Sequence, residues 1–274
     1  MNLHALNQQE PWDWPQEAGS IIQGVLADQT ATSEDRLLAA EMAGDIPILD
    51  EALAQTLGTI IGNNSEDEEL RSVAAIALGP TIELCDMHGF DDPEEVALSE
   101  KTFLQIQDSL KKLYLDGTAP ELVRRRALEA SVRAPQPWHQ DAIRSAYEAD
   151  KEDWQLTAVF CMQFVQGFEQ QILDSLDSKN PMIAYHAVCA VGNWGLKKAW
   201  PHISQLLTLD NLDKDLLLAA IEAAAAIGSP EAGEKLLGLL VADDEDIIAA
   251  THEALAMIDE DFAADDYDDD DTVA

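Results

Sequence analysis

Three features of this sequence predict an all-α fold built from repeated helical hairpins: its composition, a recurring segment with a fixed alanine, and the residues flanking each copy. Hydrophobic residues make up 47% of the 274 residues, but aromatic residues only 6%. Much of the apolar surface therefore comes from Ala, Leu and Ile, which favours closely packed helices over sheets. The expected architecture is a right-handed α-α superhelix, a solenoid of about seven hairpins.

One short helical pattern, an apolar stripe with a small residue inside it, occurs seven times along the chain. Aligned on one alanine each, the copies follow one another at steps of 29 to 36 residues, apart from one step of 53. Such a period is typical of helical repeat proteins. The aligned alanines are Ala39, Ala74, Ala127, Ala158, Ala187, Ala223 and Ala254.

Capping residues precede many of these segments, and glycine follows several of them. Thr32–Asp35 and Asn180–Pro181 supply N-cap oxygen atoms or a first-turn proline. Glycine suits the left-handed residue that ends many helices, as expected here for Gly44, Gly79, Gly192 and Gly228. The predicted unit is a helix, a tight turn and a second helix. The second helices are expected at 49–62, 138–148, 168–176, 203–209 and 232–241.

The repeated segments resemble the HEAT repeat family, in particular its short bacterial form. The resemblance rests on openings such as Arg36-Leu-Leu-Ala-Ala and on closing steps such as Leu78-Gly79, and it covers roughly residues 33–258. It implies a scaffold protein whose second helices line a concave surface. Tetratricopeptide repeats would need a stricter 34-residue period with Trp, Tyr and Phe at set places, which these copies do not show.

Three segments are expected along the chain. Residues 1–32 form an N-terminal cap, residues 33–258 form the solenoid, and residues 259–274 form an acidic, disordered tail. The 53-residue step leaves an insertion around 86–116. This insertion either lengthens a second helix or forms a binding face.

The chain is strongly acidic, with 53 acidic against 16 basic residues and a formal charge of -37. Without residues 259–274 the balance is 44 against 16, or -28. Such a field repels phosphate backbones and anionic lipid, so direct nucleic-acid and membrane binding are not expected, and it attracts a protein partner with a basic surface. Solubility alone also accounts for the charge.

A cytoplasmic location is expected. The three cysteines, an odd number without CxxC spacing, do not predict a disulfide framework. The first ten residues have neither the basic nor the apolar region of a secretory signal. The longest apolar stretch, 216–227, is much shorter than the roughly 20 residues that span a bilayer.

No catalytic motif is recognisable, so an enzyme is not expected. The sequence holds no Walker loop, dinucleotide fingerprint, GxSxG or HExxH. His186 and Cys189 lie three residues apart on one helix, but without further paired ligands core packing explains them better than a metal. No metal or cofactor is predicted, and no general acid or base can be chosen among so many carboxylates.

Aromatic and basic residues on the second helices are the candidate partner-binding residues. In an acidic chain they would form local neutral or positive islands, and Trp and Arg are favoured anchors of interfaces. The tryptophans could equally pack between hairpins. The candidates on the expected concave surface are Trp138, His139, Arg144, Lys197, Lys198, Trp200 and His202.

The leading functional prediction is a non-catalytic interaction scaffold or adaptor that binds a basic protein partner. Two alternatives stay open. One is a lyase-like protein or small-ligand binder, because the resemblance extends to bilin lyases with such repeats. The other is an inhibitor that mimics nucleic acid and blocks a basic groove. DNA glycosylases with similar repeats need a basic groove, which this charge opposes.

Overall fold

The computed structural model describes residues 2–47, 49–92, 95–209 and 211–268, and the side chains of these residues up to Ile258. Every regular element within these ranges is a helix, which confirms the all-α repeat fold. The helices form two compact units, Met1–Ala142 and Ile143–Ala274.

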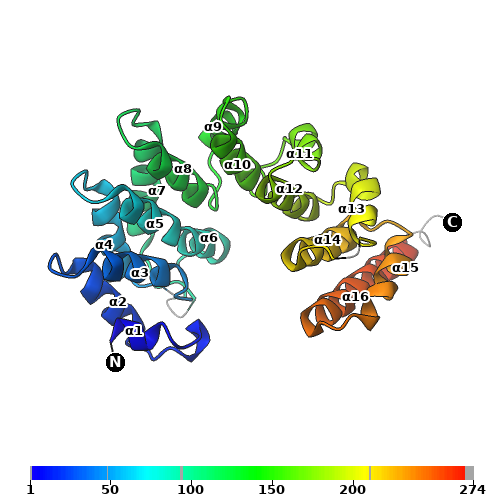
Figure 1. Ribbon diagram of the computed structural model, residues 1–274, viewed down its shortest axis with the longest axis horizontal. Helices are drawn as coiled ribbons and strands as arrows, with labels where there is room; N and C mark the ends of the chain where they lie inside the picture. Colours follow the sequence, from blue (N-terminus) through cyan, green and yellow to red (C-terminus); the bar gives the residue numbers. More distant parts are fainter. Residues whose placement is uncertain (1, 48, 93–94, 210, 269–274) are drawn as a thin grey trace. The chain divides into compact units, whose positions relative to one another are not determined.

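The first unit contains two rows of helices that pack on each other (Figure 1). Within each row, consecutive members are neighbours. The first row consists of α3 (Ser33–Gly44), α5 (Glu68–Ala77) and α8 (Glu121–Ser131), and the second row of α2 (Ala18–Ala27), α4 (Glu51–Gly62) and α7 (Glu100–Leu115). The remaining elements are α1 (Leu3–Leu6), η1 (Pro11–Asp13), α6 (Gly79–His88) and the start of α9 (Trp138–Tyr147).

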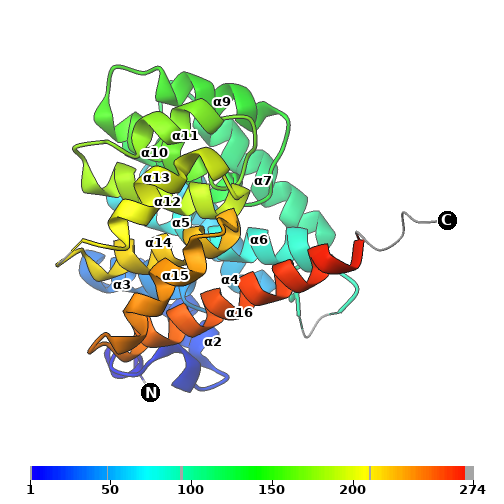
Figure 2. The same ribbon diagram turned by 90° about the vertical axis from the view of Figure 1, so that its right-hand side faces the viewer.

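The second unit has the same alternation of second-row and first-row helices, but only its first-row helices pack extensively on one another. Its last helix, α16 (Glu245–Asp268), packs against α14 and α15, as Figure 2 shows. The first row consists of α10 (Glu152–Cys161), α12 (Pro181–Trp194), α14 (Lys214–Ile227) and α16. The second row consists of α11 (Glu169–Ser175), α13 (Trp200–Leu206) after η2 (Lys197–Ala199), and α15 (Ala232–Leu237), which continues into η3 (Gly238–Val241).

The predicted alanine register is confirmed. All seven alanines lie on first-row helices; six are 0% exposed, and Ala254 is 3% exposed. Such small side chains let neighbouring helices of the row approach closely. The first-row helices of each unit therefore pack closely on one another.

The predicted pairing of helices was wrong by half a repeat. Contacts between α3 and α4 are sparse, whereas α2 packs on α3, α4 on α5 and α7 on α8. The compact hairpin is thus a second-row helix followed by a first-row helix. The tight turns that led the prediction to join α3 to α4 only connect one hairpin to the next.

Only one of the four predicted helix-ending glycines has the expected conformation. Gly228 is the left-handed C-cap of α14, with φ 60°. The cap of α12 is Gly195, whereas Gly192 lies inside that helix, where a Cβ atom would be 3.3 Å from the Ala223 Cα of the next first-row helix. Gly44 likewise faces Ala77, and Gly79 begins α6. Gly44 and Gly192 thus allow close contact between helices, and Gly79 is the first residue of a helix.

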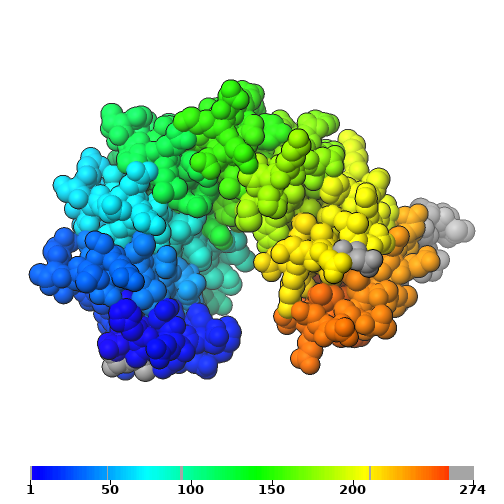
Figure 3. Space-filling view, viewed as in Figure 1, coloured from blue at the N-terminus to red at the C-terminus, as the bar shows by residue number. Residues whose placement is uncertain are grey.

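The N-terminal residues lie at one end of the first unit (Figure 3, dark blue). Leu3, Leu6 and Ile22 are buried in its core, and α2 is a regular member of the second row. Trp14 donates its indole N–H to the Leu6 and Gln9 carbonyls at 3.1 Å each. Whether residues 1–32 act as a separate cap stays a prediction.

Two other predictions concern the insertion and the tail. The insertion around 86–116 contains α7, which takes a regular place in the second row beside α4. The backbone of α16 continues to Asp268. The side chains from 259 and the backbone from 269 lie outside the described residues, so the disordered tail stays a prediction.

Candidate functional site: a groove between α4 and α7

The helices α4 and α7 are joined at their N-terminal ends by one carboxylate. Glu51, in the first turn of α4, accepts hydrogen bonds from the Ser99 backbone N–H at 3.1 Å and from the Thr102 hydroxyl. Ser99 is itself the N-cap of α7. The Thr102 hydroxyl, followed by the Ser99 N–H, lowers the pKa of Glu51. The carboxylate therefore fixes the spacing of the two helices at this end.

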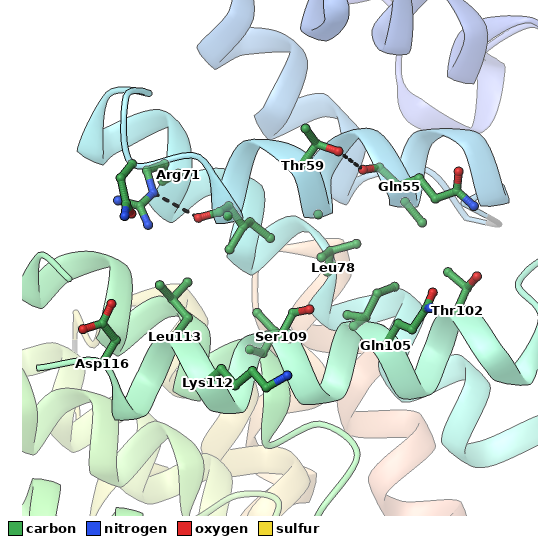
Figure 4. A pocket seen from close by; sticks show the side chains of 17 residues that line it. Gln55, Thr59, Arg71, Leu78, Thr102, Gln105, Ser109, Lys112, Leu113 and Asp116 are labelled. Atoms are coloured by element: carbon green, nitrogen blue, oxygen red, sulfur yellow. Dashed lines mark hydrogen bonds between the residues drawn. The ribbon is translucent and has the colours of Figure 1, made fainter. Parts of the chain in front are cut away.

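Beyond this junction a groove of about 640 Å³ separates the two helices (Figure 4). It exists because α4 presents Gly58 and Gly62 there, and a Cβ atom added at either glycine would meet no atom within 4 Å. The buried apolar part of the lining is Ala54, Ile61, Leu78, Ile106 and Leu110, and the exposed polar part is Gln55, Thr59, Asn64, Gln105, Ser109 and Lys112.

The rim of the groove is rich in uncharged hydrogen-bonding groups. The side chains of Gln105 and Ser109 make no hydrogen bond to any described residue, and amides and hydroxyls can both donate and accept. The lining carries two cations, Arg71 and Lys112, and one anion, Asp116. Lys112 forms an exposed ion pair with Asp108 at 2.5 Å. The groove is therefore close to neutral in a chain whose formal charge is -37.

Arg71 lies at one end of the groove, and the equivalent of its contact with the end of α4 occurs in two other hairpins as well. Its Nε donates to the Ile61 carbonyl, in the last turn of α4, at 3.0 Å. Arg36 Nε donates in the same way to Leu26 of α2 at 3.3 Å, and Arg124 Nε to Tyr114 of α7 at 2.9 Å. We call these three contacts the arginine clasps. Each satisfies a carbonyl that the end of a helix leaves free, and each closes one hairpin.

The residues predicted to bind a partner fall into two groups, one in each unit. In the first unit, Trp138 is half-buried and packs on Tyr114 with ring centroids 5.4 Å apart. Its indole N–H donates to Gln136 Oε1 at 2.8 Å, and the Lys111 ammonium lies 5.7 Å from its ring centre. Trp138 therefore packs on α7, with one face beside a cation, and its role in partner binding stays a prediction.

His139 is 0% exposed, so its side chain does not lie on a surface that a partner could touch. Its Nδ1 accepts from the Gln136 backbone N–H at 2.8 Å, which leaves Nε2 to donate to the Ser131 hydroxyl at 3.0 Å. Burial lowers the pKa of His139 to about 4. The ring is neutral, and because Nε2 already carries its proton it cannot take one from Ser131, so this buried pair is not a nucleophile with its base.

In the second unit, Lys197 and Lys198 are exposed beside a hollow of about 270 Å³ that Glu169, Leu173 and Trp194 help to line. Trp200, nearby in the sequence, donates its indole N–H to Glu231 Oε2 at 2.8 Å, and His202 Nδ1 lies 3.5 Å from Asp177 Oδ1. Arg144 is exposed on α9. A single concave surface that joins both groups stays a prediction.

The sequence reasoning missed the groove because it considered aromatic and basic residues only. The available signal was Gly58, a glycine inside an otherwise regular helical pattern that ends at Gly62. An interior glycine weakens a helix by about 1 kcal/mol relative to alanine, so Gly58 indicates a need for space on one face.

Two searches of the described residues are negative. They contain no group of three or more His, Cys, Asp or Glu side chains that could hold a metal ion, and His186 instead lies against Gln163 at 3.1 Å. Within the same residues, no helix has the length and hydropathy needed to cross a membrane.

Comparison with known families identifies the repeat. The family model for HEAT repeats matches residues 169–256. These residues are HEAT repeats. The HEAT segment begins at the first residue of α11 and ends within α16, so it covers three hairpins of a second-row helix followed by a first-row helix. This frame agrees with the pairing in the structure.

Solved structures with similarity to this chain include a natural bacterial protein, a human enzyme and a designed repeat protein. YibA of Escherichia coli is 17% identical over 90% of this chain and 84% of its own, with a TM-score of 0.47. Human deoxyhypusine hydroxylase in complex with glycerol is 15% identical over 94% and 88%, with a TM-score of 0.42. A designed armadillo repeat protein in complex with the peptide (KR)4 is 17% identical over 89% and 100%, with a TM-score of 0.34. No curated protein gives a significant match.

Proposed function

We propose that this protein is a non-catalytic cytoplasmic scaffold that binds a segment of a protein partner in the groove between α4 and α7. The observation that carries the proposal is the combination of an apolar floor with a rim of uncharged polar groups, among which the side chains of Gln105 and Ser109 make no hydrogen bond to a described residue. An extended segment can bury apolar side chains on such a floor and bond its main chain to the rim.

The charge of the chain adds a second element to the proposal. A formal charge of -37 attracts a partner with a basic surface over distances of about a Debye length, roughly 8 Å in physiological salt. The near-neutral groove then holds the segment by short-range contacts. Association is therefore expected to slow as salt increases, while dissociation changes less.

Site-specific photo-cross-linking in cells of the source organism tests the proposal. A photoreactive residue at Gln55 on α4 and, separately, at Ser109 on α7 should capture the same partner, because both side chains line the groove. A photoreactive residue at Glu41, exposed on the first-row helix α3, is the control and should capture nothing in common. The same reagent at Lys198 tests the island predicted in the second unit.

A groove-filling variant makes the test specific. Gly58→Trp places a large side chain in the open space and should abolish the cross-link from Ser109. Gly24→Trp is the matched control, because Gly24 also lies inside a second-row helix with nothing within 4 Å, but outside the groove. Adducts that persist in Gly58→Trp, or that form only at Glu41, would refute the groove as the binding site.

A further inference from the structure

Arg71 differs from Arg36 in what its terminal nitrogens bind. In Arg36 both terminal nitrogens donate to the Glu66 carboxylate, at 2.7 and 2.9 Å, and the two side chains are only 9% and 10% exposed. Arg71 is even more buried, at 3%, but its terminal nitrogens donate to no described residue. A buried guanidinium without a carboxylate is unusual, because charge-assisted pairs normally compensate its desolvation.

The missing carboxylate can be traced to one position of the repeat. Glu66 lies five residues before Arg71, and Ala119 lies five residues before Arg124. Glu66 reaches Arg36 from the loop of the following hairpin, so Ala119 occupies the corresponding position for Arg71. The alanine side chain has no oxygen with which to accept a hydrogen bond.

The two loops share one backbone conformation, which makes this comparison direct. The C-cap residues Asn63 and Asp116 have φ/ψ of -89°/104° and -75°/97°. Each accepts a hydrogen bond on Oδ1 from the N–H two residues ahead, at 3.0 Å from Ser65 and 2.9 Å from Thr118. The N-caps Asp67 and Pro120 agree as well, at -61°/143° and -54°/144°.

Asp116 does not replace the missing partner. Its Oδ1 accepts from the Thr118 N–H and from the Thr118 hydroxyl at 2.6 Å, and these bonds are the main reason why its pKa is lowered. The charge of Arg71 contributes only a smaller part of that shift, and no hydrogen bond joins the two residues. Figure 4 shows Arg71 and Asp116 at the same end of the groove.

We propose that Arg71 binds a side-chain carboxylate, from Asp or Glu, of the segment that lies in the groove. This carboxylate takes the place that Glu66 fills for Arg36. The inference rests on the proposed function for the source of the carboxylate, but the binding of a carboxylate to Arg71 can be tested without a partner. A basic partner is compatible with it, because only one acidic side chain is needed.

The probe is N-acetyl-L-glutamic acid amide, followed by NMR of the arginine Nε–H groups in the full chain at about 0.15 M salt. We expect a saturable shift of the Arg71 resonance at millimolar probe and no shift of Arg36 or Arg124. N-acetyl-L-glutamine amide, the neutral control, should leave Arg71 unchanged. An equal response to the neutral control, or no response of Arg71 to the probe, would overturn the inference.

The variant Ala119→Glu restores the carboxylate that the repeat lacks. It should move the Arg71 resonance toward the position of Arg36, abolish the response to the probe, and raise the melting temperature by about 2–4 °C. The double variant Arg71→Gln/Ala119→Glu should lose that gain. A probe response that survives in Ala119→Glu would show that the carboxylate binds elsewhere.

Two further comparisons complete the test. One distinguishes a side-chain carboxylate from the carboxylate of a chain terminus, and the other distinguishes failure of this inference from failure of the proposed function. N-acetyl-L-alanine, which imitates a chain terminus, should bind Arg71 more weakly than the glutamate probe; tighter binding would overturn the side-chain assignment. A partner cross-linked in the groove without any probe response refutes this inference alone. A probe response without any partner in the groove refutes the proposed function alone.

Discussion

His139 shows what a buried titratable residue does when it is not part of a reactive site. Its Nδ1 accepts the Gln136 N–H, and its Nε2 donates to Ser131, which in turn donates to the Leu128 carbonyl at 3.1 Å. The chain of bonds joins the end of α8 to the start of α9, and it requires a neutral ring. The residue therefore couples the stability of the first unit to pH.

The sign of this coupling follows from the lowered pKa. The folded-state pKa of His139 is about 4, against 6.5 for an ordinary histidine. As pH falls below about 6.5, the unfolded chain takes up the proton first, so stability decreases with falling pH. By pH 5 the loss from this residue should be about 2 kcal/mol.

Urea unfolding of the wild type and of His139→Gln at pH 7 and pH 5 measures this effect. The variant should be less stable at pH 7, but it should lose less stability between the two pH values. The acidic groups with lowered pKa, such as Glu66, are common to both proteins, so the difference isolates His139. Parallel pH dependences in the two proteins would contradict the assignment.

At the scale of the helix, the first row depends on close contact at its ends as well as at the aligned alanines. The C-caps of α12 and α14 are both left-handed glycines, Gly195 with φ 54° and Gly228 with φ 60°. They differ in their surroundings. A Cβ atom at Gly195 would lie 2.9 Å from the Ala226 carbonyl oxygen, whereas one at Gly228 would meet nothing within 4 Å.

This pair separates backbone strain from steric contact. Gly228→Ala should cost about 1–2 kcal/mol, the usual penalty for a left-handed alanine. Gly195→Ala should cost at least about 1 kcal/mol more, because the backbone oxygen of the neighbouring helix cannot move away as a side chain would. Equal urea midpoints for the two variants would show that the helices of this row can separate freely.

Periodicity predicted the helices and the first row well, and for a physical reason. The aligned positions are in the contacts between neighbouring first-row helices, where only small side chains fit, so the pattern appears directly in the sequence. The frame of the hairpin was not predictable in this way. The frame depends on which connection, before or after a first-row helix, joins two helices that pack on each other. Contacts such as the Arg71–Ile61 hydrogen bond decide this, whereas turn residues occur in both connections.

The groove between α4 and α7 was not predicted, for a related reason. Aromatic and basic residues were chosen by type, but burial decides their role: His139 is enclosed, and Trp138 is half-buried against Tyr114. The groove depends on the absence of a bulky side chain at Gly58 of α4, and the proposed carboxylate site depends on the absence of a carboxylate at Ala119, in the loop between α7 and α8. A missing side-chain group of this kind is recognised only when equivalent positions of the repeats are compared in the structure.

For the whole molecule, the dominant property is a charge of -37, and residues 259–274 contribute nine of the acidic residues and no basic one. Like charges repel one another in the folded chain, more strongly at low ionic strength. Ile258, buried at 5%, is the last described residue of the core.

Deleting residues 259–274 should therefore leave folding intact. In about 0.5 M salt, where charges are screened beyond a few ångströms, the melting temperature should match that of the full chain. In low salt the shortened chain should melt at the same temperature or higher, because repulsion is reduced. Differential scanning fluorimetry at both salt concentrations measures this, and a large loss of melting temperature at high salt would contradict it.

The arginine clasps also bear on how the first unit assembles in time. Each clasp joins residues only ten positions apart, such as Arg36 and Leu26. Loops of this length close within about 10–100 ns, far faster than distant segments meet. Contacts of low sequence separation speed folding, so each hairpin of this unit can close before the rows are complete. A chain emerging from the ribosome could thus complete one hairpin at a time. Successive intermediates would then differ in the number of completed hairpins and not in the structure of each hairpin.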